Sequence, residues 1–171
     1  MLDMRKPREL QQGATYHVSA RSNRQEFILE SKTLKDMLLR ILKRAKEKYQ
    51  FKLKHYCIMS NHIHLLIEPK WKEDLPRIMQ WILSRFASQF NRHFNLFGHV
   101  WWDRYRSNIV RTIRRLCETF HYISQNPVKA GIVQSADSYE YSGLYYYKRK
   151  LYGFIEPPGP DLLTEAQLLG I

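Results

Sequence analysis

Cysteines are scarce in this 171-residue sequence, and long apolar runs are absent from it. The two cysteines, Cys57 and Cys117, are too few for a secreted disulfide scaffold, and no CxxC pair indicates a thiolate zinc site. No apolar run reaches the roughly 18 residues that a membrane-spanning helix requires, and the first residues lack the apolar core of a signal peptide. We therefore expect a cytoplasmic protein without structural disulfides.

Acidic residues are also few, because 16 Asp and Glu stand against 28 Lys and Arg, a formal net charge of +12. A basic surface binds nucleic acid, since neutralising the phosphates releases their condensed counterions. High charge can also serve only to keep a protein soluble. A hydrophobic content of 44% and an aromatic content of 13% indicate a folded domain rather than a disordered chain. Nucleic acid is thus the first candidate partner, which would place the protein at the nucleoid.

The spacing of apolar residues separates expected strands from expected helices. Alternating or β-favouring runs predict strands at 14–20, on both sides of the turn Ser60-Asn61 within 51–68, and at 105–110. Apolar residues that recur every three or four positions predict helices at 31–49, 73–94 and 112–126. Pro127 is expected to end the third helix, because proline cannot donate the backbone hydrogen bond and disfavours helix at the preceding residue.

The order of these elements predicts the fold. Strand, helix, strand, strand, helix, strand is the ferredoxin-like arrangement, an α+β fold with an antiparallel sheet and helices on one face. The opposite face of the sheet is then expected to be free. Residues 1–152 are expected to form a single domain, and residues 153–171 a proline-containing C-terminal tail.

His62 and His64 lie one residue apart on an expected strand, so their side chains point to the same face of the sheet. Ile63, Leu65 and Ile67 point to the other face, where the helices are expected. Two neutral imidazoles on the free face can together bind one divalent metal. The same pattern also fits two solvated histidines or two histidines that pack in the core.

The third expected helix carries a tyrosine outside its apolar stripe. The stripe consists of Ile113, Leu116, Phe120 and Ile123. Tyr122 lies about 160° around the helix from Phe120, and Asn126 follows Tyr122 by one turn on nearly the same face. A phenol and a carboxamide are therefore displayed side by side. The alternative is that Tyr122 only packs and Asn126 only caps the helix.

Together these residues suit a reaction at phosphorus. A phenol is a weak nucleophile at neutral pH because its pKa is about 10, so the electrophile must be made reactive. A metal on a non-bridging phosphate oxygen does this, and Tyr122 could then attack while a 3′ hydroxyl departs. Asn126 could supply a third, oxygen ligand. Histidine and carboxamide ligands with open positions suit Mg²⁺ or Mn²⁺ better than structural zinc, which prefers a closed site.

Basic and aromatic residues alternate in and around the loop that precedes the fourth expected strand. This composition suits the stacking of unpaired bases and the binding of their phosphates. The candidate DNA-binding residues are Arg5, Lys6, Arg8, Trp101, Trp102, Arg104, Arg106, Arg111 and Arg115. The alternative for the tryptophans is that they fill the core.

Five segments make the sequence resemble the IS200-like single-domain Y1 transposases, and more closely their REP-associated tyrosine transposase branch. They are GATYHVSAR at 13–21, MSNHIHLLIEP at 59–69, FNRHFNLFGHVWWDRYRS at 90–107, YISQNPVKAGIV at 122–133 and YEYSG at 139–143. The second and fourth are the specific ones, with a histidine pair around one bulky hydrophobe and a tyrosine four residues before Asn-Pro. The WWDR at 101–104 departs from relatives, which often have Gln-Gly between Trp and Arg.

The resemblance implies a ferredoxin-like fold with the histidine pair on a central strand and the nucleophile on a C-terminal helix. His62 and His64 match the metal-binding pair, Tyr122 the nucleophile and Asn126 the third ligand. The insertion-sequence branch has glutamine at that last position, so asparagine favours the REP-associated branch. Members of that branch cut single-stranded DNA at hairpins of repeated extragenic palindromes and form a 5′-phosphotyrosine.

Single-stranded or hairpin DNA is therefore the expected partner, and both a homodimer and a monomer remain open. Two other functions also remain open. The first is a hairpin-binding regulator that does not cut DNA. The second is a metal-dependent phosphodiesterase that uses water, with Tyr122 in a structural role. A covalent adduct between protein and DNA distinguishes the transposase from both.

Overall fold

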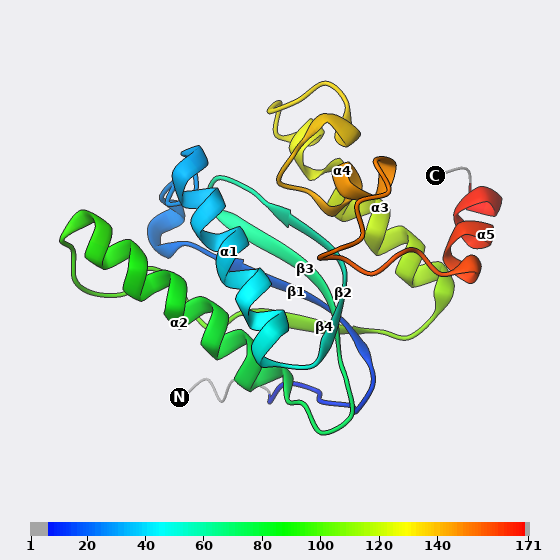
Figure 1. Ribbon diagram of the computed structural model, residues 1–171, viewed down its shortest axis with the longest axis horizontal. Coiled ribbons are helices and arrows are strands. Elements are labelled where there is room, and N and C mark those ends of the chain that lie inside the picture. The colour runs from blue at the N-terminus through cyan, green and yellow to red at the C-terminus, as the bar shows by residue number, and fades with distance from the viewer. Residues whose placement is uncertain (1–6, 170–171) are drawn as a thin grey trace, which may run out of the picture.

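A four-stranded antiparallel sheet forms the centre of the structure, which is a computed structural model that describes residues 7–169 (Figure 1). Its strands are β1 (Thr15–Arg21), β2 (Phe51–Ile58), β3 (His62–Pro69) and β4 (Arg106–Val110), in the spatial order β2-β3-β1-β4. All three neighbouring pairs are antiparallel. With one helix after β1 and one after β3, this is the expected ferredoxin-like arrangement, so the fold class is confirmed.

Two helices, α1 (Lys32–Lys48) and α2 (Leu75–Phe94), cover one face of the sheet (Figure 1). Both begin with a recognisable signal. The hydroxyl of Ser31 accepts a hydrogen bond from the Leu34 amide at the start of α1, and α2 begins with a proline in its first turn. Their apolar sides pack against Ile63, Leu65 and other alternate residues of the strands, all fully buried. The core therefore lies between these helices and the sheet.

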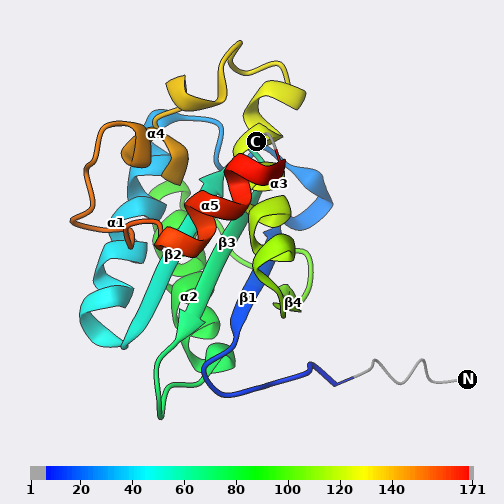
Figure 2. The same cartoon turned by 90° about the vertical axis from the view of Figure 1, so that its right-hand side faces the viewer.

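The opposite face of the sheet is not free, which corrects the expectation from sequence. It is partly covered by α3 (Ile113–Lys129), and Figure 2, turned toward this side, shows α3 and α5 (Pro160–Leu169) over the sheet. The physical reason is the apolar stripe of α3. Ile123 is fully buried, and the Phe120 ring stacks on the His55 ring of β2 with 4.0 Å between centroids. The stripe needs an apolar surface, and the β2 side of this face provides one.

Pro127 does not end α3, which continues to Lys129. Because Pro127 lies in the last turn, the helix loses only one hydrogen bond to it. The end comes at Gly131, whose φ is +69°. The amide of Gly131 donates to the Val128 carbonyl and that of Ile132 donates to the Pro127 carbonyl, which together form a Schellman motif.

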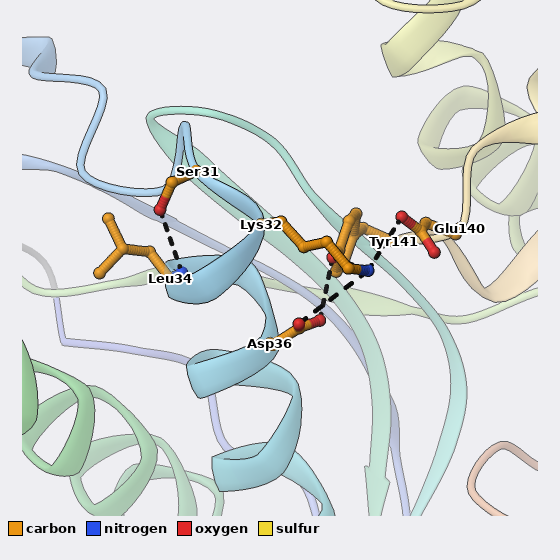
Figure 3. A network of polar contacts seen from close by, with 6 residues as sticks. All are labelled: Ser31, Lys32, Leu34, Asp36, Glu140 and Tyr141. Carbon is orange, nitrogen blue, oxygen red and sulfur yellow. Dashed lines mark hydrogen bonds and ion pairs between the residues drawn. The ribbon is translucent and has the colours of Figure 1, made fainter.

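The chain after α3 folds back onto the domain. It contains the short helices η2 (Ala136–Ser138) and α4 (Gly143–Lys148), while a further short helix, η1 (Asn23–Gln25), follows β1. Figure 3 shows how this segment is tied to α1: Lys32 contacts Glu140 and Tyr141, and the Tyr141 hydroxyl donates to Asp36. The segment expected to be a tail contributes Phe154 and Ile155 to the core, and its helix α5 packs against α3.

Within residues 7–169, no helix is long and apolar enough to cross a membrane.

We expect Gly131→Ala to lower the free energy of unfolding by about 1 kcal/mol, because a left-handed residue with a Cβ costs roughly 1 to 2 kcal/mol. Nothing lies within 4 Å of the added Cβ, so the loss would come from the backbone alone. Gly159→Ala is the matched control, because its Cβ also meets open space and its φ is not positive. Urea unfolding measures both, and equal stability of the two variants would contradict the assignment of the helix end.

Candidate functional site

A cleft of about 1400 Å³ opens on the sheet face that carries α3. Its lining comes from β1, β3 and β4, from α3, and from the segments before β1, after β1 and before β4. The three expected metal ligands and the expected nucleophile all line it, namely His62, His64, Asn126 and Tyr122. The sheet, α3 and the basic loop thus meet at one place.

His62 and His64 stand next to each other, with ring centroids 5.0 Å apart and ring planes at 87°. The expectation that both project freely is wrong for His64, which is only 6% exposed because α3 lies over this part of the sheet. Burial, followed by the positive charge of Arg21, lowers the pKa of His62 to about 4. Burial, followed by the neighbouring His62, lowers the pKa of His64 to about 3. Both imidazoles are therefore neutral at pH 7 and keep a lone pair for a metal.

The hydrogen bonds of the two rings leave the same atom available on each. His62 Nδ1 lies 2.7 Å from the side-chain oxygen of Asn61, and His64 Nδ1 lies 3.0 Å from His17 Nε2. Within the described part of the chain, no hydrogen bond engages Nε2 of either histidine. Metal-binding histidines are held in this way, with one ring nitrogen fixed by a second residue and the other turned toward the metal.

Tyr122 extends from α3 toward the histidine pair. Its ring meets the rings of His64 and His17 edge to face, with centroid distances of 5.6 and 5.9 Å, and Lys129 Nζ lies 5.5 Å from its centre. The side chain is 43% exposed, so the phenol is accessible from the cleft. Its place follows from the stripe of α3, because residues off the buried stripe must face outward.

Asn126 is placed by a bond to the same helix. Its Nδ2 donates to the Tyr122 carbonyl oxygen at 2.8 Å, which leaves Oδ1 as the free acceptor. Among residues 7–169, no three His, Cys, Asp or Glu side chains gather in a way that could hold a metal ion. The candidate set contains only two such residues and takes its third donor from this carboxamide. Two imidazoles and a neutral oxygen fit a divalent cation that keeps open positions for phosphate oxygens.

The expected DNA-binding residues fall into two groups. Arg8, Trp102, Arg104 and Arg106 line the cleft. Trp101 does not, because its indole nitrogen donates to the Leu83 carbonyl and its ring packs on Phe86, as the core-filling alternative holds.

Arg111 and Arg115 are not among the residues that line the cleft. Arg111 is paired with Glu9, and Arg115 is paired with Glu118. Arg5 and Lys6 lie outside the described residues.

Sequence reasoning missed three basic side chains that line the cleft, His17, Arg21 and Arg24. Arg21 pairs in register with His62, and His17 stacks on His64 with centroids 5.2 Å apart. Burial, followed by the charge of Arg115, lowers the pKa of His17. Alternation along β1 already puts His17 and Arg21 on one face, and this signal could have found them if the pairing of β1 with β3 had been known.

Comparison with known proteins finds a family model, a relative and two solved structures that are all described as transposases. The model of a protein family described as "Transposase IS200 like" matches residues 11–126. A predicted REP-associated tyrosine transposase of Haemophilus influenzae is 27% identical over 137 residues, which are 74% of this chain and 78% of that protein. The solved structure of a REP-associated tyrosine transposase bound to a REP hairpin has a TM-score of 0.72 at 21% identity, over 90% of this chain and 91% of that one. A crystal structure of a predicted transposase from Deinococcus radiodurans has a TM-score of 0.50 at 20% identity, over 71% of this chain and 97% of that one.

We expect His62 and His64 to remain uncharged when the metal-free protein is brought to pH 5, because their pKa values are about 4 and about 3. An NMR titration of the imidazole carbon-bound protons measures this.

The same two histidines make the stability of the protein depend on pH. Both folded-state pKa values lie below the unfolded value of about 6.5, so the unfolded chain binds more protons. The free energy of unfolding should therefore fall below about pH 6.5, by up to about 1.4 kcal/mol per pH unit for each group. Half-protonation of either ring at about pH 6.5 would be incompatible with the buried site.

Proposed function

This chain belongs to the IS200-like transposase family, and we propose that it nicks and rejoins single-stranded DNA at hairpins, with Tyr122 as the covalent nucleophile. The observation that carries the proposal is the position of Tyr122. An accessible phenol lies against His64 in a basic cleft that also contains His62 and Asn126. The similarity to REP-associated relatives supports placement in that branch.

Three atoms of this chain would hold a divalent ion, Mg²⁺ or Mn²⁺: Nε2 of His62, Nε2 of His64 and Oδ1 of Asn126. The two imidazoles are neutral at pH 7, and the carboxamide adds an oxygen donor without adding charge. When bound, the ion would withdraw charge from a non-bridging phosphate oxygen and so make the phosphorus more reactive. This set fits because none of the three atoms is engaged in a hydrogen bond within residues 7–169.

Tyr122 would lose its phenol proton to solvent and form a bond from its phenol oxygen to phosphorus, while the bond from phosphorus to the 3′ oxygen breaks and that oxygen takes up a proton from solvent. The strand with the free 3′ hydroxyl would leave, and the other strand would remain attached through its 5′ phosphate. Attack by a 3′ hydroxyl on this phosphotyrosine would rejoin DNA and release the tyrosine. The ring contacts with His17 and His64, and the ammonium of Lys129 beside the ring, would keep the phenol in place through both steps.

The rim of the cleft would bind the DNA strand. Arg8, Arg21, Arg24, Arg104 and Arg106 line the cleft and would neutralise phosphates. Trp102 is 68% exposed at the rim and offers a ring on which an unpaired base can stack. The relative solved with a REP hairpin supports a hairpin as the substrate.

One chain supplies every part of this site. Tyr122 and Asn126 come from α3, and both histidines come from β3 of the same chain. This arrangement supports a monomer as the active form.

We expect the wild-type protein with Mn²⁺ and a DNA hairpin with single-stranded flanks, taken from palindromic repeats of the host genome, to form an adduct that survives a denaturing gel. Tyr122→Phe removes one oxygen and keeps the ring, so hairpin binding should persist while the adduct falls to background. Tyr152→Phe is the matched control, because Tyr152 is also exposed and does not line the cleft. Peptide mapping should find the DNA on Tyr122.

Each alternative gives a different result in this experiment. A water-using phosphodiesterase would cut the hairpin without an adduct in all three proteins. A hairpin-binding regulator would give neither cleavage nor adduct. An adduct that maps to another tyrosine would keep the reaction class and refute the assignment of Tyr122.

We expect Trp102→Ala to weaken the binding of a single-stranded oligonucleotide by about 1 to 3 kcal/mol, because one base would lose its stacking partner. Trp71→Ala is the control, since Trp71 is 74% exposed but lies away from the cleft. Fluorescence anisotropy at fixed salt measures both affinities. Equal losses in the two variants would argue against a specific stacking role.

A further inference from the structure

His17 contacts both the candidate metal ligand and the candidate nucleophile. It lies on β1, and its Nε2 is 3.0 Å from Nδ1 of His64. The two rings are stacked with centroids 5.2 Å apart and an angle of 29° between planes. The Tyr122 ring meets His17 edge to face at 5.9 Å. No other described side chain is in ring contact with both His64 and Tyr122.

The short contact between two neutral imidazoles allows two placements of one proton. If Nδ1 of His64 carries the proton, it donates to His17, and Nε2 of His64 keeps its lone pair. If Nε2 of His17 carries the proton instead, Nδ1 of His64 accepts, and the proton of His64 then sits on Nε2. In the second case His64 cannot bind a metal through the atom that faces the cleft. The hydrogen-bond partner of Nδ1 therefore decides whether His64 can bind a metal through Nε2.

Two observations favour the first placement. At His62, the equivalent Nδ1 lies 2.7 Å from the side-chain oxygen of Asn61, which can only accept, so that ring carries its proton on Nδ1. His17 occupies the corresponding place beside His64. His17 is also the more exposed of the two stacked rings, so solvent can satisfy the proton that its own Nδ1 must then carry.

We propose that His17 is a positioning residue, which accepts the Nδ1 proton of His64 so that Nε2 of His64 presents its lone pair to the metal, and which braces the Tyr122 ring. This inference rests on the proposed function, because it assigns a role within the same site. His17 is not itself expected to bind the metal, since its Nε2 is already engaged by His64.

The first measurement is the tautomer of His64 in the metal-free protein, read from its ¹⁵N chemical shifts by NMR. The wild type should show the proton on Nδ1. In His17→Phe, which keeps a ring for packing but has no acceptor, the proton should move to Nε2 in a large fraction of molecules. In His17→Gln, a carboxamide oxygen can replace the acceptor, and the Nδ1 form should return. Thermal unfolding shows which variants are folded.

The second measurement is the affinity for Mn²⁺ without DNA, determined by electron paramagnetic resonance. His17→Phe should bind Mn²⁺ about 10- to 100-fold more weakly, as is typical when the residue that orients a metal-binding histidine is lost. His17→Gln should recover most of the wild-type affinity. With ¹⁵N-labelled histidine, the bound ion should show coupling to two imidazoles.

Several results would overturn the proposal. A wild-type His64 with its proton on Nε2 would do so even if neither variant folds. Wild-type Mn²⁺ affinity in folded His17→Phe would show that His17 only packs, and coupling to three imidazoles would make it a ligand. Neither measurement needs DNA, so an absent adduct at Tyr122 refutes the proposed function alone, whereas an unchanged tautomer in His17→Phe refutes the positioning role alone.

Discussion

The contact between α3 and β2 is the constraint on which the candidate site depends. His55 is fully buried, its ring stacks on Phe120, and its Nε2 lies 2.8 Å from the Ser124 hydroxyl. Phe120 and Ser124 lie one helical turn apart, so their two contacts with His55 fix the position of α3 along its axis and its rotation about that axis. Tyr122 lies between them in sequence and is turned toward His64. Burial lowers the pKa of His55 to about 3, so at neutral pH no charge disturbs this apolar contact.

The cleft combines two neutral histidines, the candidate metal ligands, with several arginines. Burial keeps His62 and His64 neutral, and the positive charge of Arg21 lowers both pKa values further. Arg21 also lines the cleft, so the same charge would help to attract a polyanion such as DNA. A metal bound by the two imidazoles would add to the neutralisation of the scissile phosphate. Part of the excess positive charge of the sequence is thus concentrated at this cleft.

Local patterns in the sequence were enough to predict most of the fold and to select four residues that line the same cleft. Strand alternation placed His62 and His64 on one face, and the helical stripe placed Tyr122 off it, because both depend only on the period of the backbone. What the sequence could not provide was long-range pairing. His17 meets His64 because β1 and β3 pair with Ser19 opposite His64, and the contacts that hold α3 over the sheet include the one between Phe120 and His55 of β2. Pro127 was misjudged because a proline in the last helical turn costs only one hydrogen bond.

A crystal of the protein soaked with Mn²⁺ tests the proposed site most directly. Anomalous scattering locates the ion independently of any assay with DNA. The proposed site predicts a single strong peak in the cleft, bonded to Nε2 of His62, Nε2 of His64 and Oδ1 of Asn126, with the Tyr122 hydroxyl on the same side. An ion bound elsewhere, or bonded through Nδ1 of either histidine, would contradict it.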